Sequence, residues 1–92
     1  MAAALDDEME VDATLRAVLV DILGLPQAEV AAFDDETELF GALPEFDSMA
    51  VAGLLTELEE RLGILIEDHE VGAEMMESYG ALLAFARAKA LR

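Results

Sequence analysis

Hydrophobic residues recur along this chain at the three- and four-residue intervals of amphipathic helices. The first such segment has apolar positions that share one helix face: Val11, Leu15, Val18, Leu19 and Ile22. Acidic residues precede this face, where they favour the positive end of a helix dipole. Gly24 is suited to the cap that ends such a helix. The pattern predicts a helix over residues 10–23.

The segment from Pro26 to Asp47 has no helical period and predicts a long loop. Pro26 can open a helical turn at residues 27–30, and the polar run at 34–37 marks an exposed connection. Loops of this length in compact domains are usually functional or held by apolar anchors. The residues expected to anchor it are Val30, Phe33, Leu39, Phe40, Leu43 and Phe46.

A second amphipathic helix is predicted over residues 51–62, after a start near Ser48, and Gly63 should end it. Its apolar stripe consists of Val51, Leu54, Leu55, Leu58 and Leu62. A short third helix is expected within residues 68–76, with Val71, Met75 and Met76 turned inward.

Ser78 is suited to cap a fourth helix that continues through Leu91. Its expected core contacts are Tyr79, Leu82, Leu83 and Ala86. The predicted fold class is therefore all-α, a small four-helix bundle with a long first loop and a short third helix.

The charge of the chain restricts its partners. Twenty-one acids against five bases give 92 residues a formal net charge of −16, and three of the five bases lie in the last six residues. Nucleic acid is excluded as a direct ligand, because phosphate contacts require clustered Lys and Arg. An anionic membrane surface is disfavoured for the same reason. With 55% hydrophobic residues, the chain should nevertheless fold around a core.

One domain is expected over residues 10–92, preceded by an acidic, flexible tail at residues 1–9. The N-terminus has no basic region followed by an apolar run, and no stretch reaches membrane-spanning length. We therefore expect a cytoplasmic protein.

Catalytic and metal-binding constellations are not apparent in the sequence. There is no cysteine, and the single histidine, His69, stands among carboxylates without the spacing of a zinc site. No nucleophile, base and orienting group can be assembled from these residue types. We expect neither an enzyme nor a metal site.

Ser48 is the main candidate for chemistry, because it lies where an acidic, glycine-containing loop becomes the second long helix. Backbone N–H groups are unpaired at a helix start, and the dipole favours an attached anion there. Ser and Asp are also the ordinary residues for capping a helix, so capping is the alternative role for Ser48 and Asp47.

The sequence Asp47-Ser48-Met49 resembles the Asp-Ser-Leu motif of the acyl carrier protein family. Further matches are Leu23-Gly24-Leu25, Leu39-Phe40-Gly41 and the segment from Leu58 to Ile64, so the resemblance extends from Val11 to Ala86. It implies that Ser48 carries 4′-phosphopantetheine, joined covalently from coenzyme A. It also implies that Asp47 contacts the phosphopantetheinyl transferase and the magnesium that this enzyme brings.

The same resemblance implies two further sets of residues. Partner enzymes would dock on Met49, Ala50, Ala52, Gly53, Thr56, Glu59 and Glu60. The residues expected to form an acyl pocket are first of all core residues, in a core that could open to shelter an acyl chain: Leu55, Leu58, Ile66, Met75 and Leu83. The partners would be the transferase and acyl-transferring, ligase or synthase enzymes with basic or apolar docking patches, and the carrier itself would be a monomer.

The implied function is a discrete acyl carrier protein, which moves acyl groups as thioesters in fatty acid, other lipid, polyketide or specialised biosynthesis. Carriers of fatty acid synthases usually have acids just after the serine motif, where this chain has Ala50 and Gly53. In this respect the chain resembles carriers of exopolysaccharide and exosortase gene clusters. The alternatives are a peptidyl or aminoacyl carrier loaded by an adenylating ligase, and an unmodified helical interaction module.

Overall fold

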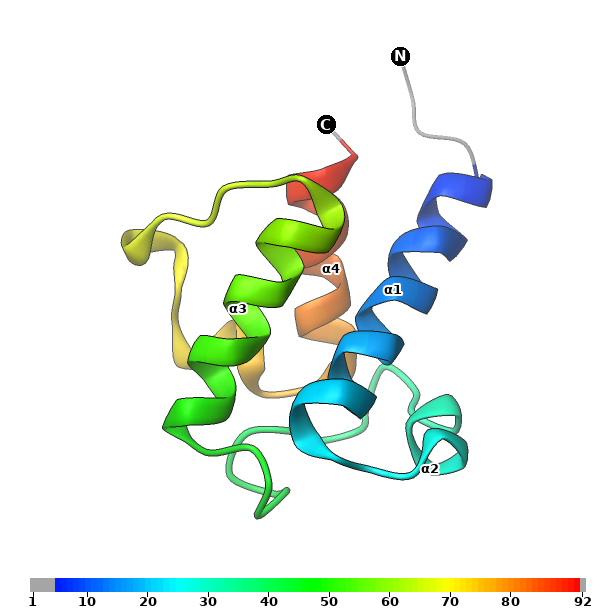
Figure 1. The fold of residues 1–92 in the computed structure, drawn as a ribbon, viewed down its shortest axis with the longest axis vertical. Coiled ribbons are helices and arrows are strands. Elements are labelled where there is room, and N and C mark those ends of the chain that lie inside the picture. The colour runs from blue at the N-terminus through cyan, green and yellow to red at the C-terminus, as the bar shows by residue number, and fades with distance from the viewer. Residues whose placement is uncertain (1–4, 92) are drawn as a thin grey trace.

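The structure, a computed structural model, describes residues 5–91 as an all-α bundle (Figure 1). Its elements are α1 (Leu5–Leu23), α2 (Gln27–Ala31), α3 (Ser48–Leu62), the 3-10 turns η1 (Asp68–Glu70) and η2 (Ala73–Met76), and α4 (Tyr79–Ala90). Helix α1 packs against both α3 and α4 and runs in the opposite direction to them. The predicted bundle, with its long first loop, is confirmed.

The first helix begins at Leu5, earlier than the predicted start near Glu10. Residues 5–9 therefore continue the helix, and the rest of the expected tail, residues 1–4, lies outside the described residues. Acidic residues in a first helical turn are stabilised by the dipole, which favours this earlier start. A side-chain nitrogen of Arg87 on α4 also donates to the carbonyl oxygen of Glu8 at 3.2 Å.

The predicted ranges of α3 and α4 are confirmed, as are the end of α3 at Gly63 and the cap of α4 at Ser78. The Ser78 hydroxyl accepts a hydrogen bond from the N–H of Ala81 at 3.1 Å and so caps α4. Gly63 ends α3 in the left-handed conformation, with φ 64°, and its N–H donates to the carbonyl of Glu59. The buried residues of α4 are those expected from the sequence: Tyr79, Leu82, Leu83 and Ala86.

The segment from α2 to the start of α3 is held by buried side chains. Val30, Phe33, Leu39 and Phe46 are buried, as predicted, and Leu43 packs partly buried against the core. Phe40 is the exception, since its side chain is 43% exposed. The expectation that Phe40 is a core anchor is therefore wrong, because the preceding residue, Leu39, occupies the interior position.

Backbone hydrogen bonds join this loop to the start of α4. The N–H groups of Leu39 and Phe40 donate to the carbonyls of Glu77 and Met76, both at 3.0 Å. In return, the N–H of Tyr79 donates to the carbonyl of Thr37 at 2.8 Å. Segments distant in the sequence are thereby fixed side by side, which places the approach to Ser48 against η2.

The predicted third helix is present as two separate 3-10 turns, because Val71 and Gly72 between them are extended. Glu70 holds the first turn to α4, since both of its carboxylate oxygens accept from Lys89 Nζ at 2.9 Å. The backbone N–H of Glu67 and the Lys89 ammonium hold the pKa of the Glu70 carboxyl below its usual range. These contacts keep Val71 and Gly72 facing α3.

Tyr79 joins α4 to the two helices that precede the loop. Its side chain is fully buried, and its hydroxyl donates to the carboxylate of Asp12 on α1. Burial, together with this hydrogen bond, raises the pKa of the phenol. The guanidinium of Arg16 lies 4.6 Å from the ring centroid and donates to the carbonyl of Val30 at 2.7 Å, which caps the end of α2.

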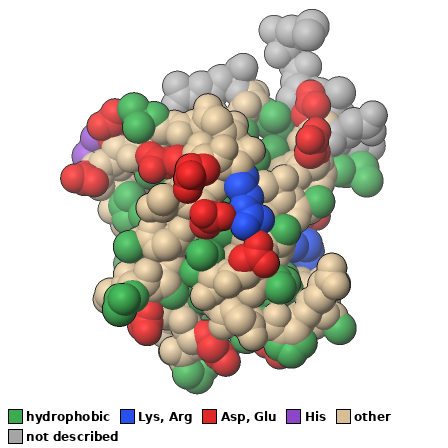
Figure 2. All heavy atoms as spheres, viewed as in Figure 1, with side chains coloured by type: hydrophobic (Ala, Val, Ile, Leu, Met, Phe, Trp, Pro, Cys, Tyr) green, Lys and Arg blue, Asp and Glu red, His purple; other side chains and the backbone are tan. Residues whose placement is uncertain are grey.

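Acidic side chains outnumber basic ones on the face shown in Figure 2, and the basic group near its centre lies next to acids. Arg61 is an example, since it contacts Asp21 at 2.7 Å and Glu57 at 2.9 Å. No helix among the described residues combines the length and apolar character that a membrane crossing requires.

Candidate functional site

Ser48 is the first residue of α3, and its side chain is exposed. The residue that caps this helix is Asp47, whose Oδ1 accepts a hydrogen bond from the N–H of Ala50 at 2.9 Å. Within residues 5–91, the Ser48 hydroxyl has no hydrogen-bond partner. Of the two roles considered for these residues, capping therefore belongs to Asp47, and the Ser48 hydroxyl is available for modification.

The cap predicts a stability effect at Asp47. Asp47→Ala should lower the free energy of unfolding by about 0.5–2 kcal/mol, because the N–H of Ala50 loses its acceptor. Asp47→Asn should lose much less, since its amide oxygen can accept the same bond. Urea unfolding measures both variants, with Glu45→Ala as the matched control at an exposed neighbouring acid. Equal stabilities for Asp47→Ala and the control would contradict the cap.

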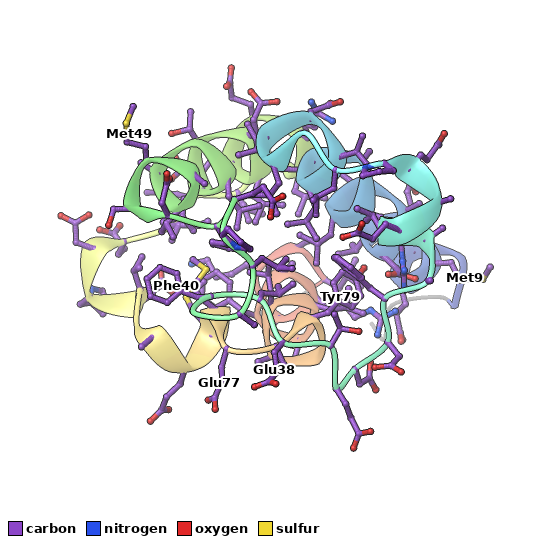
Figure 3. The ribbon with its side chains drawn as sticks, turned by 90° about the horizontal axis from the view of Figure 1, so that it is seen from below. Met9, Glu38, Phe40, Met49, Glu77 and Tyr79 are labelled. Atoms are coloured by element: carbon purple, nitrogen blue, oxygen red, sulfur yellow. The ribbon has the colours of Figure 1, made fainter. Side chains whose placement is uncertain are left out.

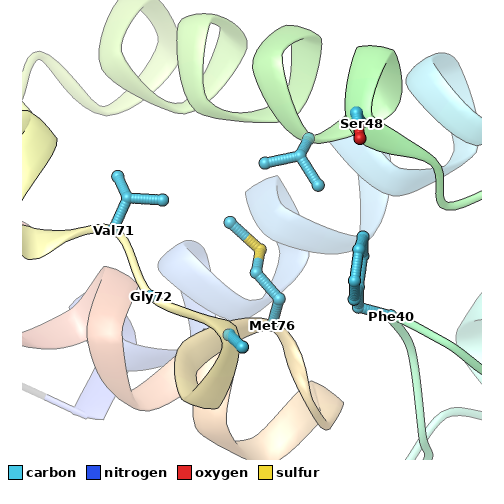
Figure 4. A pocket seen from close by; sticks show the side chains of 7 residues that line it. Phe40, Ser48, Val71, Gly72 and Met76 are labelled. Atoms are coloured by element: carbon cyan, nitrogen blue, oxygen red, sulfur yellow. The ribbon is translucent and has the colours of Figure 1, made fainter.

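A cavity of about 330 Å³ opens beside Ser48 (Figure 4). Its lining comes from the loop before α3, from the first turn of α3 and from the segment that contains η2. The lining residues are Phe40, Ser48, Val51, Val71, Gly72, Ala73 and Met76. Ser48 supplies the only side-chain polar group among them, so the cavity suits an apolar occupant.

Phe40 forms one wall of this cavity. Its ring packs edge-on against the buried ring of Phe46, with centroids 6.0 Å apart and an interplanar angle of 88°. Figure 3 shows Phe40 between α3 and the segment of η1 and η2, whereas Met49 points away from the bundle. Of the two exposed, large apolar side chains near Ser48, Phe40 lines the cavity and Met49 does not.

The residues predicted for an acyl pocket lie in the core or against it. Leu58 and Leu83 are buried in the core, while Leu55, Ile66 and Met75 pack against it. None of the five lines the cavity beside Ser48. Of the residues that line the cavity, Val51 could have been expected from the sequence. It is three residues after Ser48, and residues three apart are neighbours on one face of a helix. Residues 71–76 reach the cavity through tertiary packing.

The predicted docking residues fall into two groups. Met49, which is 85% exposed, shares one exposed face of α3 with Ala52, Thr56 and Glu60. We call these four residues the docking face.

The other three predicted docking residues have structural contacts. Ala50 packs partly buried against the core, and a side chain at Gly53 would contact Ile22 on α1 at 3.6 Å. Glu59 accepts a hydrogen bond from the N–H of Ile66 at 2.8 Å. These contacts make the surface available to a partner narrower than the sequence suggested.

Metal ligands are not assembled anywhere in the part of the chain that the structure describes: it has no group of three or more His, Cys, Asp or Glu residues that could hold an ion. His69 and the carboxylates around it, where no metal site was expected, form no such group.

Comparison with known families gives a match over residues 13–86 to the family described as "Phosphopantetheine attachment site". The chain belongs to this family of carrier proteins. Among solved structures, the carrier is similar to a holo acyl carrier protein from Nitrosomonas europaea determined by solution NMR. The two share 33% sequence identity and a TM-score of 0.75, over 85% of this chain and 92% of the other. No curated protein matches the carrier significantly.

Members of this family are not enzymes, and their cofactor is covalently bound phosphopantetheine. This group supplies a thiol, which the carrier cannot provide because it has no cysteine. The site fits the group in two respects. A phosphodiester at the start of α3 would lie at the positive end of a 15-residue helix, and an apolar cavity adjoins the exposed hydroxyl.

Proposed function

We propose that Ser48 is the attachment site and that the protein is an acyl carrier, which presents acyl thioesters to successive partner enzymes. The observation that carries this proposal is the exposed Ser48 hydroxyl, which is left without a hydrogen-bond partner within residues 5–91 because Asp47 caps α3. Its oxygen forms the phosphodiester to the pantetheine arm. The unpaired N–H groups of the first helical turn stabilise the charge of this linkage.

The proposal is tested by intact mass measurement after incubation with coenzyme A and a broad-specificity phosphopantetheinyl transferase. We expect one phosphopantetheine per chain. An unchanged mass under conditions that modify a known carrier would refute the attachment and favour an unmodified interaction module.

Asp47 is proposed to have a second role, in contact with the transferase and its magnesium. Its side chain remains exposed while one oxygen caps α3, so the carboxylate is accessible to an approaching enzyme. The net charge of −16 favours partner enzymes with basic patches, because long-range electrostatic attraction would steer such enzymes towards the carrier.

Acyl cargo is favoured over aminoacyl cargo by the chemistry of the cavity. An ammonium group needs a carboxylate or several oxygen acceptors when it leaves water, and no charged side chain lines the cavity. The cavity therefore suits an amino acid, loaded by an adenylating ligase, less well than it suits an acyl group.

We propose further that the carrier serves a specialised pathway, of the kind associated with exopolysaccharide and exosortase genes, instead of housekeeping fatty acid synthesis. The docking face supports this, because Met49 and Ala52 next to Ser48 are exposed and uncharged. Glu60 is the only acid of that face and lies at its far end. Partners that dock at Ser48 should therefore contact apolar side chains first.

The docking face predicts partner selectivity. Wild-type holo-protein should be a poor malonyl acceptor from a fatty acid synthase transacylase, and Ala52→Glu with Thr56→Glu should improve it. Each new rim pair is worth about 0.2–1 kcal/mol, so the gain should appear mainly as faster, salt-sensitive association. Malonyl transfer rates at two salt concentrations measure the effect.

The matched control for this pair is Ala84→Glu with Ala88→Glu, which adds the same charge at two exposed positions of α4. An equal gain in the control would assign the effect to net charge instead of the docking face. Wild-type transfer as fast as that of a housekeeping carrier would contradict the proposal.

We also propose that the carrier is a cytoplasmic monomer whose domain spans residues 10–92. The family match over 13–86 supports these limits. Residues 5–9 extend α1 ahead of that domain.

A further inference from the structure

Met49 is the most exposed of the methionines that the structure describes. Its side chain is 85% exposed, and Figure 3 shows it pointing away from the bundle. Met9, near the start of α1, is 60% exposed, whereas Met76 is buried and Met75 is partly buried against the core. A buried methionine fills gaps in a core, but an exposed one gains no such packing. The stability of the fold therefore does not explain a methionine at this position.

The thioether of Met49 lies beside the proposed attachment point. Met49 follows Ser48 in the first turn of α3 and belongs to the docking face. An enzyme that reacts with the Ser48 hydroxyl covers this face and takes the Met49 side chain out of water. The neighbouring Ala52 is uncharged, and the Thr56 hydroxyl already donates to the carbonyl of Ala52 at 3.0 Å. The contact made over Met49 is therefore mainly apolar.

Thioethers are the most readily oxidised side chains of the unmodified chain, which has neither cysteine nor tryptophan. With hydrogen peroxide the reaction transfers two electrons. The sulfur lone pair attacks one peroxide oxygen, the O–O bond breaks, and the other oxygen leaves as water. The thioether is oxidised to a sulfoxide and the peroxide is reduced. Because access limits this attack, Met49 is the sulfur expected to react first.

We propose that Met49 is a site of reversible oxidation, and that its sulfoxide hinders the phosphopantetheinyl transferase from docking at Ser48. The sulfoxide is polar, so an apolar contact over Met49 would bury its oxygen without a hydrogen-bond donor, which is costly. The inference rests on the proposed attachment at Ser48 and goes beyond it, since it adds a second modification site and a condition for loading. Peroxide thereby slows the loading of new arms, whose thiol it would also oxidise.

The first test is the order in which the methionines of unmodified protein react with hydrogen peroxide, followed by peptide mass. Met49 should form its sulfoxide at least as fast as Met9 and several times faster than the buried Met76. Circular dichroism should not change at this stage, because Met49 points away from the bundle. Oxidation of Met49 no faster than that of Met76 would overturn the assignment of the site.

The second test is the rate at which a broad-specificity phosphopantetheinyl transferase loads the protein, before peroxide treatment and after removal of the peroxide. Met9→Leu leaves Met49 as the exposed thioether of the described chain. Its oxidised form should lose about five- to thirtyfold in kcat/KM, mainly through a higher KM for the carrier. Methionine sulfoxide reductase should restore the loading rate.

Met49→Leu is the matched control, because leucine conserves the volume of methionine and has no sulfur. This variant should be loaded equally fast before and after the treatment. An equal loss in Met49→Leu would assign the effect to another methionine or to the fold, and the inference would be wrong. It would also be wrong if oxidised Met9→Leu were loaded at its original rate, or if the reductase failed to restore loading.

A failure of the attachment itself gives a different result. Reduced wild-type protein would then show no mass increase with coenzyme A and the transferase, which would overturn the attachment and the proposed effect of oxidation together. A mass increase in reduced protein, with no difference after oxidation of Met49, would overturn the role of Met49 alone.

Discussion

Replacing Ser48 with alanine is expected to abolish the mass increase produced by coenzyme A and a phosphopantetheinyl transferase. The chain has two serines, and only Ser48 combines exposure with a hydroxyl that caps nothing. Ser48→Ala should fold normally, because the cap of α3 is supplied by Asp47. Circular dichroism and intact mass, measured on the same sample, separate loss of the hydroxyl from loss of the fold.

The control is Ser78→Ala. Its hydroxyl caps α4, so this variant should lose about 0.5–2 kcal/mol of stability while remaining fully modified. Persistent labelling of Ser48→Ala would show that the phosphopantetheine is attached elsewhere, and the proposed site would then be wrong.

Substitution of Gly80 should produce the largest loss of stability among the glycines of the described chain. A Cβ at this position would lie 2.7 Å from the carbonyl oxygen of Asp35, which is closer than real Cβ contacts allow. The N–H of Gly80 also donates to that oxygen at 3.1 Å, so the loop cannot retreat without breaking a hydrogen bond. Overpacking of this kind costs about 1–3 kcal/mol, and occasionally more.

Gly80→Val and Gly72→Val form a matched pair for thermal unfolding. Gly72 has extended backbone, with φ −147° and ψ 163°, and a Cβ there meets nothing within 4 Å. In a domain of this size each kcal/mol lowers Tm by about 4–8 °C, so the two variants should differ clearly. Similar melting temperatures would show that the loop yields to a side chain at Gly80.

The parts of the fold that depend on local pattern were predictable from the sequence. The apolar stripe of α3 and the Ser78 cap of α4 each follow from residues a few positions apart. The start of α1 and the division of residues 68–76 into two 3-10 turns were missed. Arg87 and Lys89 of α4 contact these two segments, at the carbonyl of Glu8 and the carboxylate of Glu70, and such contacts between distant residues are not part of a local pattern.

The candidate site was predictable to a similar extent. Ser48 and Asp47 stand next to each other in a recognisable motif, although the motif could not say which of them caps the helix. The cavity could not be predicted, because Val71 and Met76 meet Phe40 only after the chain has folded. An exposed phenylalanine in particular runs against the usual expectation that large apolar residues are buried.

The hydrogen bonds between residues 35–40 and residues 76–80 have a consequence for the order in which the protein becomes competent during synthesis. Until the later segment has left the ribosome, the loop before Ser48 has no partner for these N–H groups and carbonyls, although α1 and α3 are already complete. Contacts between distant segments also form slowly, since the intervening chain must first be brought together. Residues 76–80 must therefore leave the ribosome before the loop that leads to Ser48 can take its folded position beside η2.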